Sequence, residues 1–432
     1  MIAEDFLHRS AEAFPYKTAV VCGSDTLTYS ELYKYAVAKA ESMKVTGMIV
    51  PLKAKATLDF LIDYFSIHFA GGIAAPLEKN IPDELFADYK NIFSRADVPS
   101  GSADILYTTG TTGKSKGVII SHRAIIANAE NLVSAQRYSQ DITFIINGPL
   151  NHIGSLSKIY PAIYVGATLH VIDGLKDMNL FFDAVEKAPG KVATFLVPAG
   201  IRMLLTFAKD KLTYYADKID FIETGAAQIS ESDMHSLCEL LPCSKLYNTY
   251  ASTETGIIST FNFNDYECLP GCLGVPMVHS DIVVASDGRI LCKGDTLMTG
   301  YLEDEEETGR VLSDGMLLTS DIGYLDERGR LWLKGRVDDV INIGGLKVSP
   351  TEVENVAMSL AFVKDCACVS VSHPILGTIL KLLVETDSKL DKRLLAQHLK
   401  SKLEPYKVPT LYEKVESIHK TFNGKTDRKK YV

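Results

Sequence analysis

The sequence lacks the features that mark several classes of protein. No apolar run approaches the roughly 20 residues that a membrane-spanning helix needs. Residues 1–14 include Glu4 and Asp5 and have no apolar stretch, so they do not have the pattern of a secretory signal. There is no internal repeat and no low-complexity tract. We therefore expect a cytoplasmic protein without a transmembrane segment.

Paired cysteines and excess positive charge are also missing. The eight cysteines are scattered, and none has the C-x-x-C spacing of a zinc or redox site. Such cysteines in a large intracellular protein are usually small buried apolar residues, so we expect no structural disulfide. The net charge is -9, which argues against nucleic acid as a main partner. A nucleotide is not excluded, because a single loop can be positive.

Length and composition indicate a globular protein of two or three domains. The 432 residues are too many for one ordinary core, and 46% apolar with 23% charged residues is typical of globular chains. Helical and strand patterns alternate through the first two thirds, which favours layered α/β structure with largely parallel sheets. The helical patterns lie at 31–40, 59–70, 180–187 and 201–209, and the strand patterns at 142–146, 168–172, 194–197 and 219–223.

The pattern changes twice in the last third of the chain. From Gly271 to Leu333, short strand-like segments are separated by turns, which predicts a small β-barrel or distorted sheet. After Gly335, the order helix, strand, strand, helix predicts a compact α+β domain. The predicted domains are an N-terminal domain at 1–337, divided into α/β layers at 1–270 and a β-barrel-like part at 271–337, and a C-terminal domain at 338–432.

The most informative segment is Tyr107–Val118, Y-T-T-G-T-T-G-K-S-K-G-V, between two apolar strand patterns. Its glycines let backbone N–H groups approach an anion, and its threonine hydroxyls and lysines add donors and charge. We therefore predict that this loop binds the phosphates of a nucleotide. The predicted contacts come from Thr108, Thr109, Gly110, Thr111, Thr112, Gly113 and Lys116. The alternative is a hairpin rich in Thr and Gly that binds no ligand.

A Walker A loop is the main rival for this segment. Its pattern G-x-x-x-x-G-K-[ST] needs glycine at position 108, where this chain has Thr108. A strand pattern follows the loop directly, whereas a Walker A loop leads into a helix. The helical pattern begins later, with Ser121 as the predicted N-cap.

Two further segments carry side chains suited to nucleotide chemistry, and each also has a plainer interpretation. His152 follows a strand pattern and would lie at the sheet edge where α/β proteins bind ligands, or it is a solvated loop residue. Tyr250 can stack on a purine and Glu254 can hold Mg²⁺. The alternative for that segment is the start of a helix capped by Ser252 or Thr253.

Three more candidates lie toward the C-terminus. Asp321 can accept hydrogen bonds from both hydroxyls of a ribose, or it belongs to an ordinary turn. Arg336 can reach a ribose or a phosphate, or it belongs to a solvated linker. Lys425 follows the turn signal Asn423-Gly424 and can meet charge that develops at a carboxylate–phosphate centre, or it belongs to a basic tail.

Together and in this order, these segments resemble the adenylate-forming family of acyl-CoA synthetases, luciferases and peptide-synthetase adenylation domains. The family's [ST]-[ST]-G-T-T-G-x-P-K-G, Y-G-x-T-E and T-G-D are similar to 108–117, 250–254 and 319–321. Its G-R-x-D-D-x-I-x-x-x-G-x-x-x-x-P-x-E-x-E and N-G-K-x-x-R are similar to 335–354 and 423–428. The resemblance covers nearly the whole chain.

The resemblance implies two domains that move relative to each other. The large α/β domain would bind ATP and the acid, and the small α+β domain would swing over it about a hinge at Asp338. Lys425 would be the catalytic residue that contacts the carboxylate and the α-phosphate. Rotation would withdraw Lys425 and bring Gly344 and Gly345 to the site for attack by a thiol.

The resemblance also implies the remaining site residues. His152 would gate the acid pocket, and Glu254 with Thr111 would hold Mg²⁺. The loop 224–227 would lie beside the adenine and the acid. Adenine and ribose would be held by Gly225, Ala226, Asn248, Tyr250, Asp321 and Arg336.

The chain departs from the family at a few positions. Ser115 replaces a proline of the phosphate loop, and Ala251 and Ser320 replace glycines. The last two would be strained if those positions need positive φ. The phosphate loop comes early and the segment 77–104 looks trimmed, so we expect a shortened N-terminal region.

These observations predict an AMP-forming ligase that activates a carboxylic acid with ATP and passes the acyl group to coenzyme A. The segment 149–154 favours coenzyme A, because it resembles the P-L-x-H-x-x-G of the CoA ligases. One alternative is a free-standing enzyme that loads an acyl carrier protein, and a minor one is a catalytically silent nucleotide-binding paralogue. Mg²⁺ is the predicted metal, and a monomer or homodimer is expected. The sequence does not identify the acid.

Overall fold

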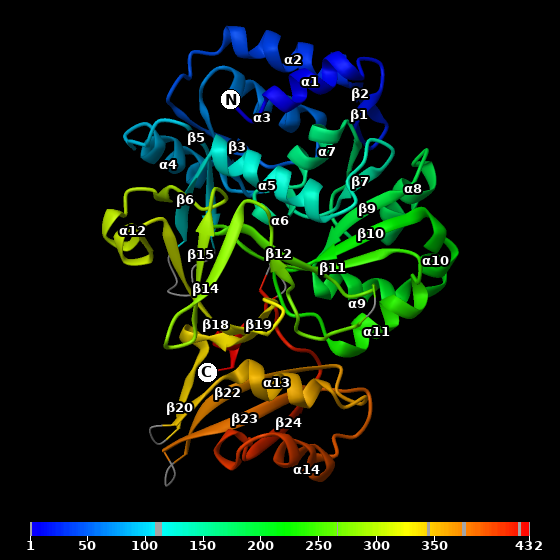
Figure 1. The fold of residues 1–432 in the computed structure, drawn as a ribbon, viewed down its shortest axis with the longest axis vertical. Helices are drawn as coiled ribbons and strands as arrows, with labels where there is room; N and C mark the ends of the chain where they lie inside the picture. Colours follow the sequence, from blue (N-terminus) through cyan, green and yellow to red (C-terminus); the bar gives the residue numbers. More distant parts are fainter. Residues whose placement is uncertain are drawn as a thin grey trace.

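The computed structural model describes residues 2–108, 115–265, 267–343, 346–373, 377–421 and 425–431. It has a large N-terminal part built on three sheets and a smaller C-terminal part that lies below it in Figure 1. In the part of the chain that is described, no helix combines the length and the apolar character that a membrane crossing requires.

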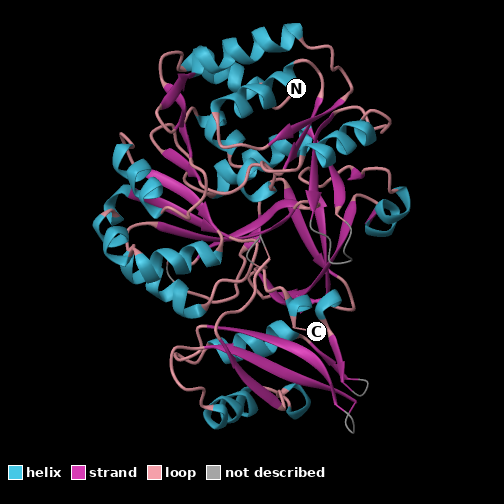
Figure 2. Ribbon diagram, turned by 180° about the vertical axis from the view of Figure 1, so that it is seen from behind, coloured by secondary structure: helices cyan, strands magenta, loops and turns pink. Residues whose placement is uncertain are grey.

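A nine-stranded sheet forms the centre of the large part (Figures 1 and 2). Its strands in spatial order are β13 (Val275–Pro276), β12 (Gly256–Asn262), β11 (Lys245–Ser252), β10 (Ile219–Thr224), β9 (Val192–Leu196), β7 (Thr143–Ile146), β8 (Thr168–Val171), β1 (Thr18–Cys22) and β2 (Asp25–Thr28). Neighbours from β11 to β1 are parallel, and the pairs at both edges are antiparallel. The strand patterns predicted at 142–146, 168–172, 194–197 and 219–223 all lie in this parallel region.

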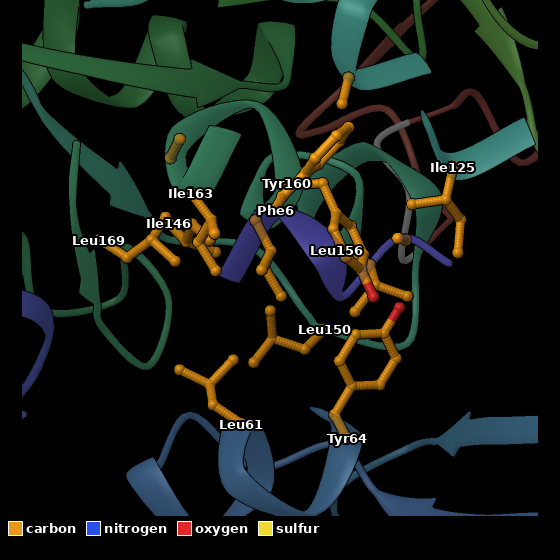
Figure 3. Packing of buried hydrophobic residues seen from close by; sticks show 14 of the residues in the cluster. Phe6, Leu61, Tyr64, Ile125, Ile146, Leu150, Leu156, Tyr160, Ile163 and Leu169 are labelled. Atoms are coloured by element: carbon orange, nitrogen blue, oxygen red, sulfur yellow. The ribbon is translucent and has the colours of Figure 1, made fainter. Parts of the chain in front are cut away.

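Both faces of this sheet are covered by helices, which explains why its central strands β7, β8 and β9 are mostly buried and rich in apolar residues. On β7, Phe144 and Ile146 pack into one core cluster, whereas Ile145 packs into another on the opposite face. The first face is covered by α1 (Asp5–Ala13), α3 (Leu58–Phe69), α5 (His122–Ala135) and α7 (Ile159–Val165), and the second by α8 (Met178–Lys187), α9 (Pro198–Phe207), α10 (Lys209–Tyr214) and α11 (Glu231–Leu240). Figure 3 shows the first cluster, where α1, α3 and α7 meet.

The second sheet carries the predicted phosphate loop. Its order is β16 (Gly300–Tyr301), β6 (Lys116–Ser121), β5 (Ser102–Thr108), β4 (Ile73–Leu77) and β3 (Ile49–Lys53). The strands β3, β4 and β5 are parallel, and β5 and β6 form an antiparallel hairpin. The helices α2 (Tyr29–Ser42) and α4 (Asp83–Phe93) lie in the same N-terminal region.

The third sheet is antiparallel and resembles half a barrel. It contains β14 (Ser280–Val284), β15 (Arg289–Gly294), β18 (Met316–Leu325), β17 (Leu312–Ser313) and β19 (Leu331–Arg336), with α12 (Glu305–Val311) beside it. A separate apolar cluster that includes Ile282, Ile290 and Leu331 forms its core. The predicted β-barrel-like part is therefore present.

The C-terminal part has its own core, formed by residues such as Val353, Leu382 and Leu399. Its elements are the 3₁₀ helix η2 (Val337–Asp339), the hairpin β20 (Ile341–Ile343) and β21 (Leu346–Val348), α13 (Pro350–Met358), the sheet β22 (Asp365–His373), β23 (Gly377–Glu385) and β24 (Leu411–Val415), and α14 (Lys392–Lys402). The predicted fold class, a large α/β domain followed by a small α+β domain, is confirmed. The boundary at Asp338 falls in η2 and stays a prediction.

Candidate active site

Three predicted site segments meet at one edge of the nine-stranded sheet. The strands β7, β9, β10 and β11 are parallel, so their carboxyl ends lie on the same side. His152 follows β7, Gly225 and Ala226 follow β10, and Glu254 follows β11. This edge is where open α/β sheets bind their ligands.

The predicted phosphate loop joins β5 to β6, with Thr108 paired to Lys116 at its base. The predicted contacts Thr109, Gly110, Thr111, Thr112 and Gly113 lie outside the described residues. The chain leaves the loop as strand β6 and starts α5 only at His122, after the Ser121 hydroxyl has accepted the Ala124 N–H at 3.2 Å. The strand after the loop excludes a Walker A arrangement, and the predicted N-cap is confirmed.

Lys116 is held at the base of the loop by an acid. Its Nζ lies 2.6 Å from Glu307 Oε1. Glu307 also accepts two hydrogen bonds from Arg310, which together with Lys116 lower the pKa of Glu307 to about 2. The Lys116 ammonium lies 4.9 Å from the centre of the Tyr301 ring. A phosphate that binds Lys116 must therefore compete with Glu307.

Glu254 lies beside the same strands, in the turn between β11 and β12. The Tyr301 hydroxyl donates to Glu254 Oε1 at 3.2 Å, and Tyr301 pairs with Val118 of β6. Mg²⁺ in nucleotide sites usually takes one or two carboxylates together with phosphate oxygens. Glu254 fits this role, because it is a carboxylate beside the strand that leaves the phosphate loop.

The alternative helix start after Tyr250 is wrong. The strands β11 and β12 form an antiparallel hairpin, so the segment turns back into a strand. The Ser252 hydroxyl does accept the N–H of Thr255 at 3.0 Å, but it stabilises this turn instead of a helix. The local hydrogen bond was readable from the sequence, whereas the antiparallel pairing of β11 with β12 decided the structure.

Asp321 is the centre of a polar group where β11 approaches the third sheet. It pairs directly with Arg336 on the neighbouring strand, and Arg336 Nη1 donates to Asp321 Oδ1 at 2.8 Å. The hydroxyl of the buried Tyr250 donates to Asp321 Oδ2 at 2.7 Å. Burial and the Asp321 charge raise the pKa of Tyr250. The two donors fix the carboxylate, so that its remaining lone pairs can accept the hydroxyls of a ribose.

Replacing Asp321 with asparagine should raise the KM for ATP about 10- to 100-fold, because hydrogen bonds to a charged group contribute about 1.5–3 kcal/mol. The variant keeps the shape of the side chain but loses the charge that pairs with Arg336. Asp326→Asn is the matched control, since Asp326 bonds Arg330 and Trp332 in a turn of the same sheet. Equal KM values for both variants would refute the role of Asp321.

The loop after β10 shows why small residues are needed there. A Cβ on Gly225 would lie 2.9 Å from the Thr249 carbonyl oxygen, so the two strands approach too closely for a side chain. Ala226 has φ of 66°, a left-handed conformation that is uncommon outside glycine. Ala251 and Ser320 are not among the described residues with positive φ, so the expected strain at these two positions is absent.

The predicted acid-pocket segments meet at Phe195. His152 precedes the short helix α6 (Ile153–Leu156), and burial lowers the pKa of its imidazole. A Cβ added to Gly154 would lie 3.1 Å from the Phe195 ring, and one added to Gly225 would lie 3.6 Å from it. The segments after β7 and β10 therefore both approach this ring, which belongs to β9.

A buried ion pair beside Phe195 was not predicted. Lys158 Nζ lies 2.8 Å from both carboxylate oxygens of Glu223, and the two side chains are 2% and 1% exposed. The Lys158 ammonium lies 5.2 Å from the centre of the Phe195 ring, and Phe195 pairs with Glu223 on the neighbouring strand. Burial lowers the pKa of Lys158, and Glu223 opposes this shift. A charged residue within each apolar pattern was the signal that could have revealed the pair.

Lys425 pairs with Thr421 in a hairpin contact, and the residues between them, 422–424, lie outside the described residues. The Thr421 N–H donates to the Lys425 carbonyl at 2.7 Å, and the Lys425 N–H donates to the Thr421 hydroxyl at 3.2 Å. Lys420 and Thr426 form an antiparallel bridge below them. The hairpin thus projects Lys425 from the small domain.

The charges around Lys425 belong to the predicted nucleotide site. Loss of water around its ammonium lowers the pKa of Lys425, and the positive charge of Arg336 lowers it further. The charges of Asp321, Glu254 and Asp339 act in the opposite direction. The residue as a whole is exposed. The Lys425 ammonium therefore experiences the charges of the predicted ribose and metal residues.

The ends of two motif segments, 335–354 and 423–428, bind each other. Arg428 Nη2 donates to both oxygens of Glu354 on α13, at 2.8 and 2.6 Å. Its Nη1 lies 3.3 Å from Asp339 Oδ2 in η2. Glu354 also accepts the Cys368 N–H at 2.7 Å. These bonds anchor the segment that carries Lys425 to the helix and sheet of the small domain.

The remaining predicted site residues are Asn248, Asp338, Gly344 and Gly345. Asn248 Nδ2 donates to the Cys272 carbonyl at 3.0 Å, so its buried amide holds β11 to the segment that contains Cys272. Asp338 lies in η2, and its side chain is outside the described atoms. Gly344 and Gly345 also lie outside the described residues.

A second polar cluster lies behind the phosphate loop. His68 Nδ1 lies 2.5 Å from Glu4 Oε1, and its Nε2 lies 2.9 Å from the Ala103 carbonyl. Burial opposes a charge on His68, but Glu4 and Asp104 outweigh it and raise the pKa of His68 to about 10. The hydroxyls of Tyr64 and Tyr160, which bond Asp104 and Glu4, point toward one another in Figure 3.

This cluster is structural. Glu4, His68 and His122 have the spacing of a metal group in the described part of the chain, but both ring nitrogens of His68 are already engaged. The bonds tie α1 and α3 to β5, the strand that enters the phosphate loop. The cluster thus fixes the base of that loop.

Comparison with known proteins places the chain in a family. A family model described as AMP-binding enzyme matches residues 90–302, and one described as AMP-binding enzyme C-terminal domain matches residues 352–425. The solved structure of ATP-bound MatB from Rhodopseudomonas palustris has a TM-score of 0.88 at 20% identity and covers 99% of this chain and 98% of that one, which shows the fold.

Curated relatives match most of the chain. The 2-succinylbenzoate–CoA ligase of Listeria monocytogenes serovar 1/2a is 30% identical over 336 residues, which are 77% of this chain and 70% of the relative. The indoleacetate–CoA ligase of Aromatoleum aromaticum is 29% identical over 336 residues, which are 74% of this chain and 65% of the relative. In both cases the relative is the longer protein. The chain belongs to the AMP-binding enzyme family.

Proposed function

We propose that this chain is an AMP-forming acid–CoA ligase. The observation that carries the proposal is the convergence of Lys425, Glu254 and the Asp321–Arg336–Tyr250 group beside the hairpin of the phosphate loop. An acid–CoA ligase needs these parts: a phosphate loop, a metal-binding acid, a ribose acid and a mobile lysine. ATP and coenzyme A are its substrates, and Mg²⁺ is its metal.

The first half-reaction joins the acid to AMP. A carboxylate oxygen of the acid attacks the α-phosphorus of ATP, and pyrophosphate leaves. Lys425 holds the carboxylate and the α-phosphate together and stabilises the charge that develops between them. Glu254 would hold Mg²⁺, which neutralises charge on the phosphates. Lys116 and the loop hold the β- and γ-phosphates, and Asp321 fixes the ribose.

The second half-reaction transfers the acyl group. The sulfur of coenzyme A attacks the acyl carbon, and AMP leaves as the carbon–oxygen bond breaks. We propose that the small domain turns about Asp338 between the two half-reactions and brings Gly344 and Gly345 to the site. The curated relatives are named as CoA ligases, which does not favour the carrier-protein alternative. A monomeric or dimeric state and a cytoplasmic location stay predictions.

We further propose a short or polar acid as the substrate. The Lys158–Glu223 pair lies beside Phe195, where the acid-pocket segments meet. The pair is buried, so a long alkyl chain that extends past Phe195 would have to reach and desolvate it, whereas a short acid stops before it and a polar group could hydrogen-bond to it. Long-chain fatty acids should therefore be poor substrates.

A pyrophosphate-release screen tests these proposals. Aromatic, short-chain, hydroxylated and long-chain acids are each supplied with ATP and Mg²⁺, and either coenzyme A or an acyl carrier protein. We expect AMP, pyrophosphate and an acyl-CoA thioester from a short or polar acid. Turnover only with the carrier protein would contradict the choice of coenzyme A. Absence of acyl-adenylate with every acid would overturn the ligase function.

A further inference from the structure

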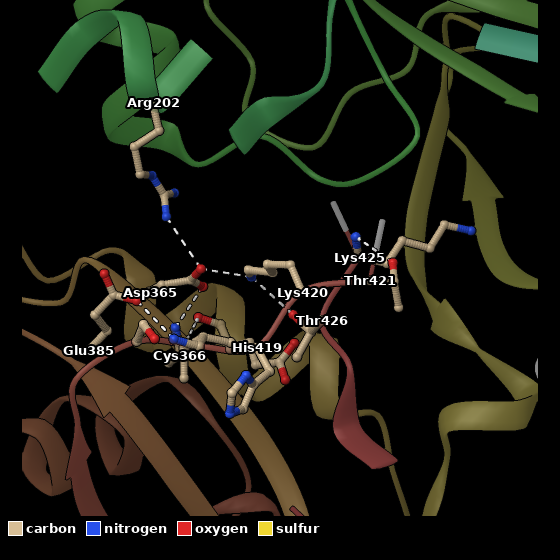
Figure 4. A network of polar contacts seen from close by, with 12 residues as sticks. Arg202, Asp365, Cys366, Glu385, His419, Lys420, Thr421, Lys425 and Thr426 are labelled. Atoms are coloured by element: carbon tan, nitrogen blue, oxygen red, sulfur yellow. Dashed lines mark hydrogen bonds and ion pairs between the residues drawn. The ribbon is translucent and has the colours of Figure 1, made fainter. Parts of the chain in front are cut away.

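A chain of charges connects the large domain to the small domain (Figure 4). Arg202 lies on α9 of the large domain, and its Nη1 is 3.4 Å from Oδ2 of Asp365, the first residue of β22 in the small domain. Lys420 Nζ lies 2.7 Å from the same oxygen. Asp365 therefore forms an ion pair with one cation from each domain.

Both ends of this contact are held in place by other bonds. Arg202 donates to Asp233 Oδ2 on α11 through Nε at 3.2 Å and Nη2 at 3.0 Å. Asp365 accepts the Cys366 N–H on its other oxygen at 2.8 Å, and its side chain is only 12% exposed. Charged groups held in this way lose little side-chain freedom when they pair, unlike the flexible ends of most surface pairs.

The contact reaches the base of the hairpin that carries Lys425. Lys420, which binds Asp365, bridges to Thr426 across the hairpin. Only four residues separate Lys420 from Lys425 along the chain, and Figure 4 shows both on the segment that faces the large domain. A displacement of Asp365 from Arg202 must therefore move the support of this hairpin.

We propose that Arg202 and Asp365 are positioning residues for acyl-adenylate formation. They hold the small domain in the arrangement that places Lys425 beside Asp321 and Glu254. Neither residue has a place among the reacting atoms. The inference rests on the proposed ligase function and adds a requirement to it: the contact must open when the domain turns for thiol attack.

Separate measurement of the two half-reactions tests the inference. Asp365→Asn, Arg202→Met and the double variant are compared with the wild type in single-turnover pyrophosphate release and in transfer from pre-formed acyl-adenylate to coenzyme A. Each single variant should slow acyl-adenylate formation about 5- to 30-fold, which corresponds to 1–2 kcal/mol. Thioester formation should be unchanged or faster, and the double variant should be no slower than the singles.

Lys364→Gln is the matched control, because Lys364 precedes Asp365 and pairs with Asp387 within the small domain. It should leave both half-reactions unchanged. Single variants that resemble this control, or that slow both half-reactions equally, would overturn the inference. Thermal unfolding checks each variant, and Arg202→Met tests the contact from the other domain if Asp365→Asn does not fold. A wild type that makes no acyl-adenylate would instead overturn the ligase function.

Discussion

Replacing Lys425 with alanine should slow acyl-adenylate formation by about 100- to 1,000-fold, the usual cost of removing one charge-stabilising donor. The charges of Arg336, Asp321 and Glu254 all act on the Lys425 ammonium. Transfer of the acyl group from pre-formed acyl-adenylate to coenzyme A should change little, because Lys425 is withdrawn in that step. Single-turnover measurements of pyrophosphate and thioester separate the two effects.

Lys430→Ala provides the control for this variant. Lys430 lies in the exposed 3₁₀ helix η4 (Arg428–Lys430), so its loss also removes one positive charge from the C-terminal segment. It should retain wild-type rates in both half-reactions. If Lys425→Ala also retained its rate of carboxylate-dependent pyrophosphate exchange, Lys425 would have no part in the chemistry.

The pH dependence gives a second test of Lys425. Its pKa lies below the ordinary lysine value of 10.5, so the free enzyme should lose the ammonium form earlier than a solvated lysine as pH rises. The rate of adenylation should therefore fall on the alkaline side. Lys425→Arg should move this fall to higher pH, because a guanidinium stays protonated there.

The sequence was sufficient for the fold class and for the side of the sheet where the site lies. Apolar patterns predicted the parallel strands β7 to β10, and the carboxyl ends of parallel strands must share an edge. The segments after them could therefore be brought together without knowledge of any contact. Asp321 and Arg336 follow the same logic, because adjacent antiparallel strands place them opposite each other.

The polar contacts made by residues far apart in the chain could not be predicted in this way. Lys158 and Glu223 lie in different elements, and so do Arg202 and Asp365. A single sequence gives no register between such elements, and a charged residue in an apolar pattern indicates burial without naming its partner. The same limit applies to Lys116, which was predicted to bind phosphate but is paired with Glu307 in the structure.

The Lys158–Glu223 pair should show a strong asymmetry between single and double variants. Lys158→Met leaves the Glu223 carboxylate without its cation in a fully buried site, so the free energy of unfolding should fall by about 3–5 kcal/mol. The double variant with Lys158→Met and Glu223→Leu removes both charges together, so its free energy of unfolding should be close to that of the wild type. Urea denaturation of the wild type, Lys158→Met and the double variant measures these differences.

Arg289→Met is the control, because Arg289 pairs with Asp287 at the surface and its loss should cost less than about 1 kcal/mol.

Glu223→Leu alone leaves the Lys158 ammonium without its partner. Burial already lowers the pKa of Lys158, and loss of Glu223 should lower it further. The destabilisation by Glu223→Leu should therefore shrink as pH rises, because Lys158 can then be buried as a neutral amine.

The double variant also connects stability to substrate choice. If it folds as expected, the wall beside Phe195 becomes apolar while Lys425 and the nucleotide residues stay unchanged. Its rate of adenylation should then rise for longer apolar acids and fall for short or polar ones. A double variant as unstable as Lys158→Met would show that the two charges do not compensate each other. A double variant with the acid preference of the wild type would show that the pair does not limit the acid pocket.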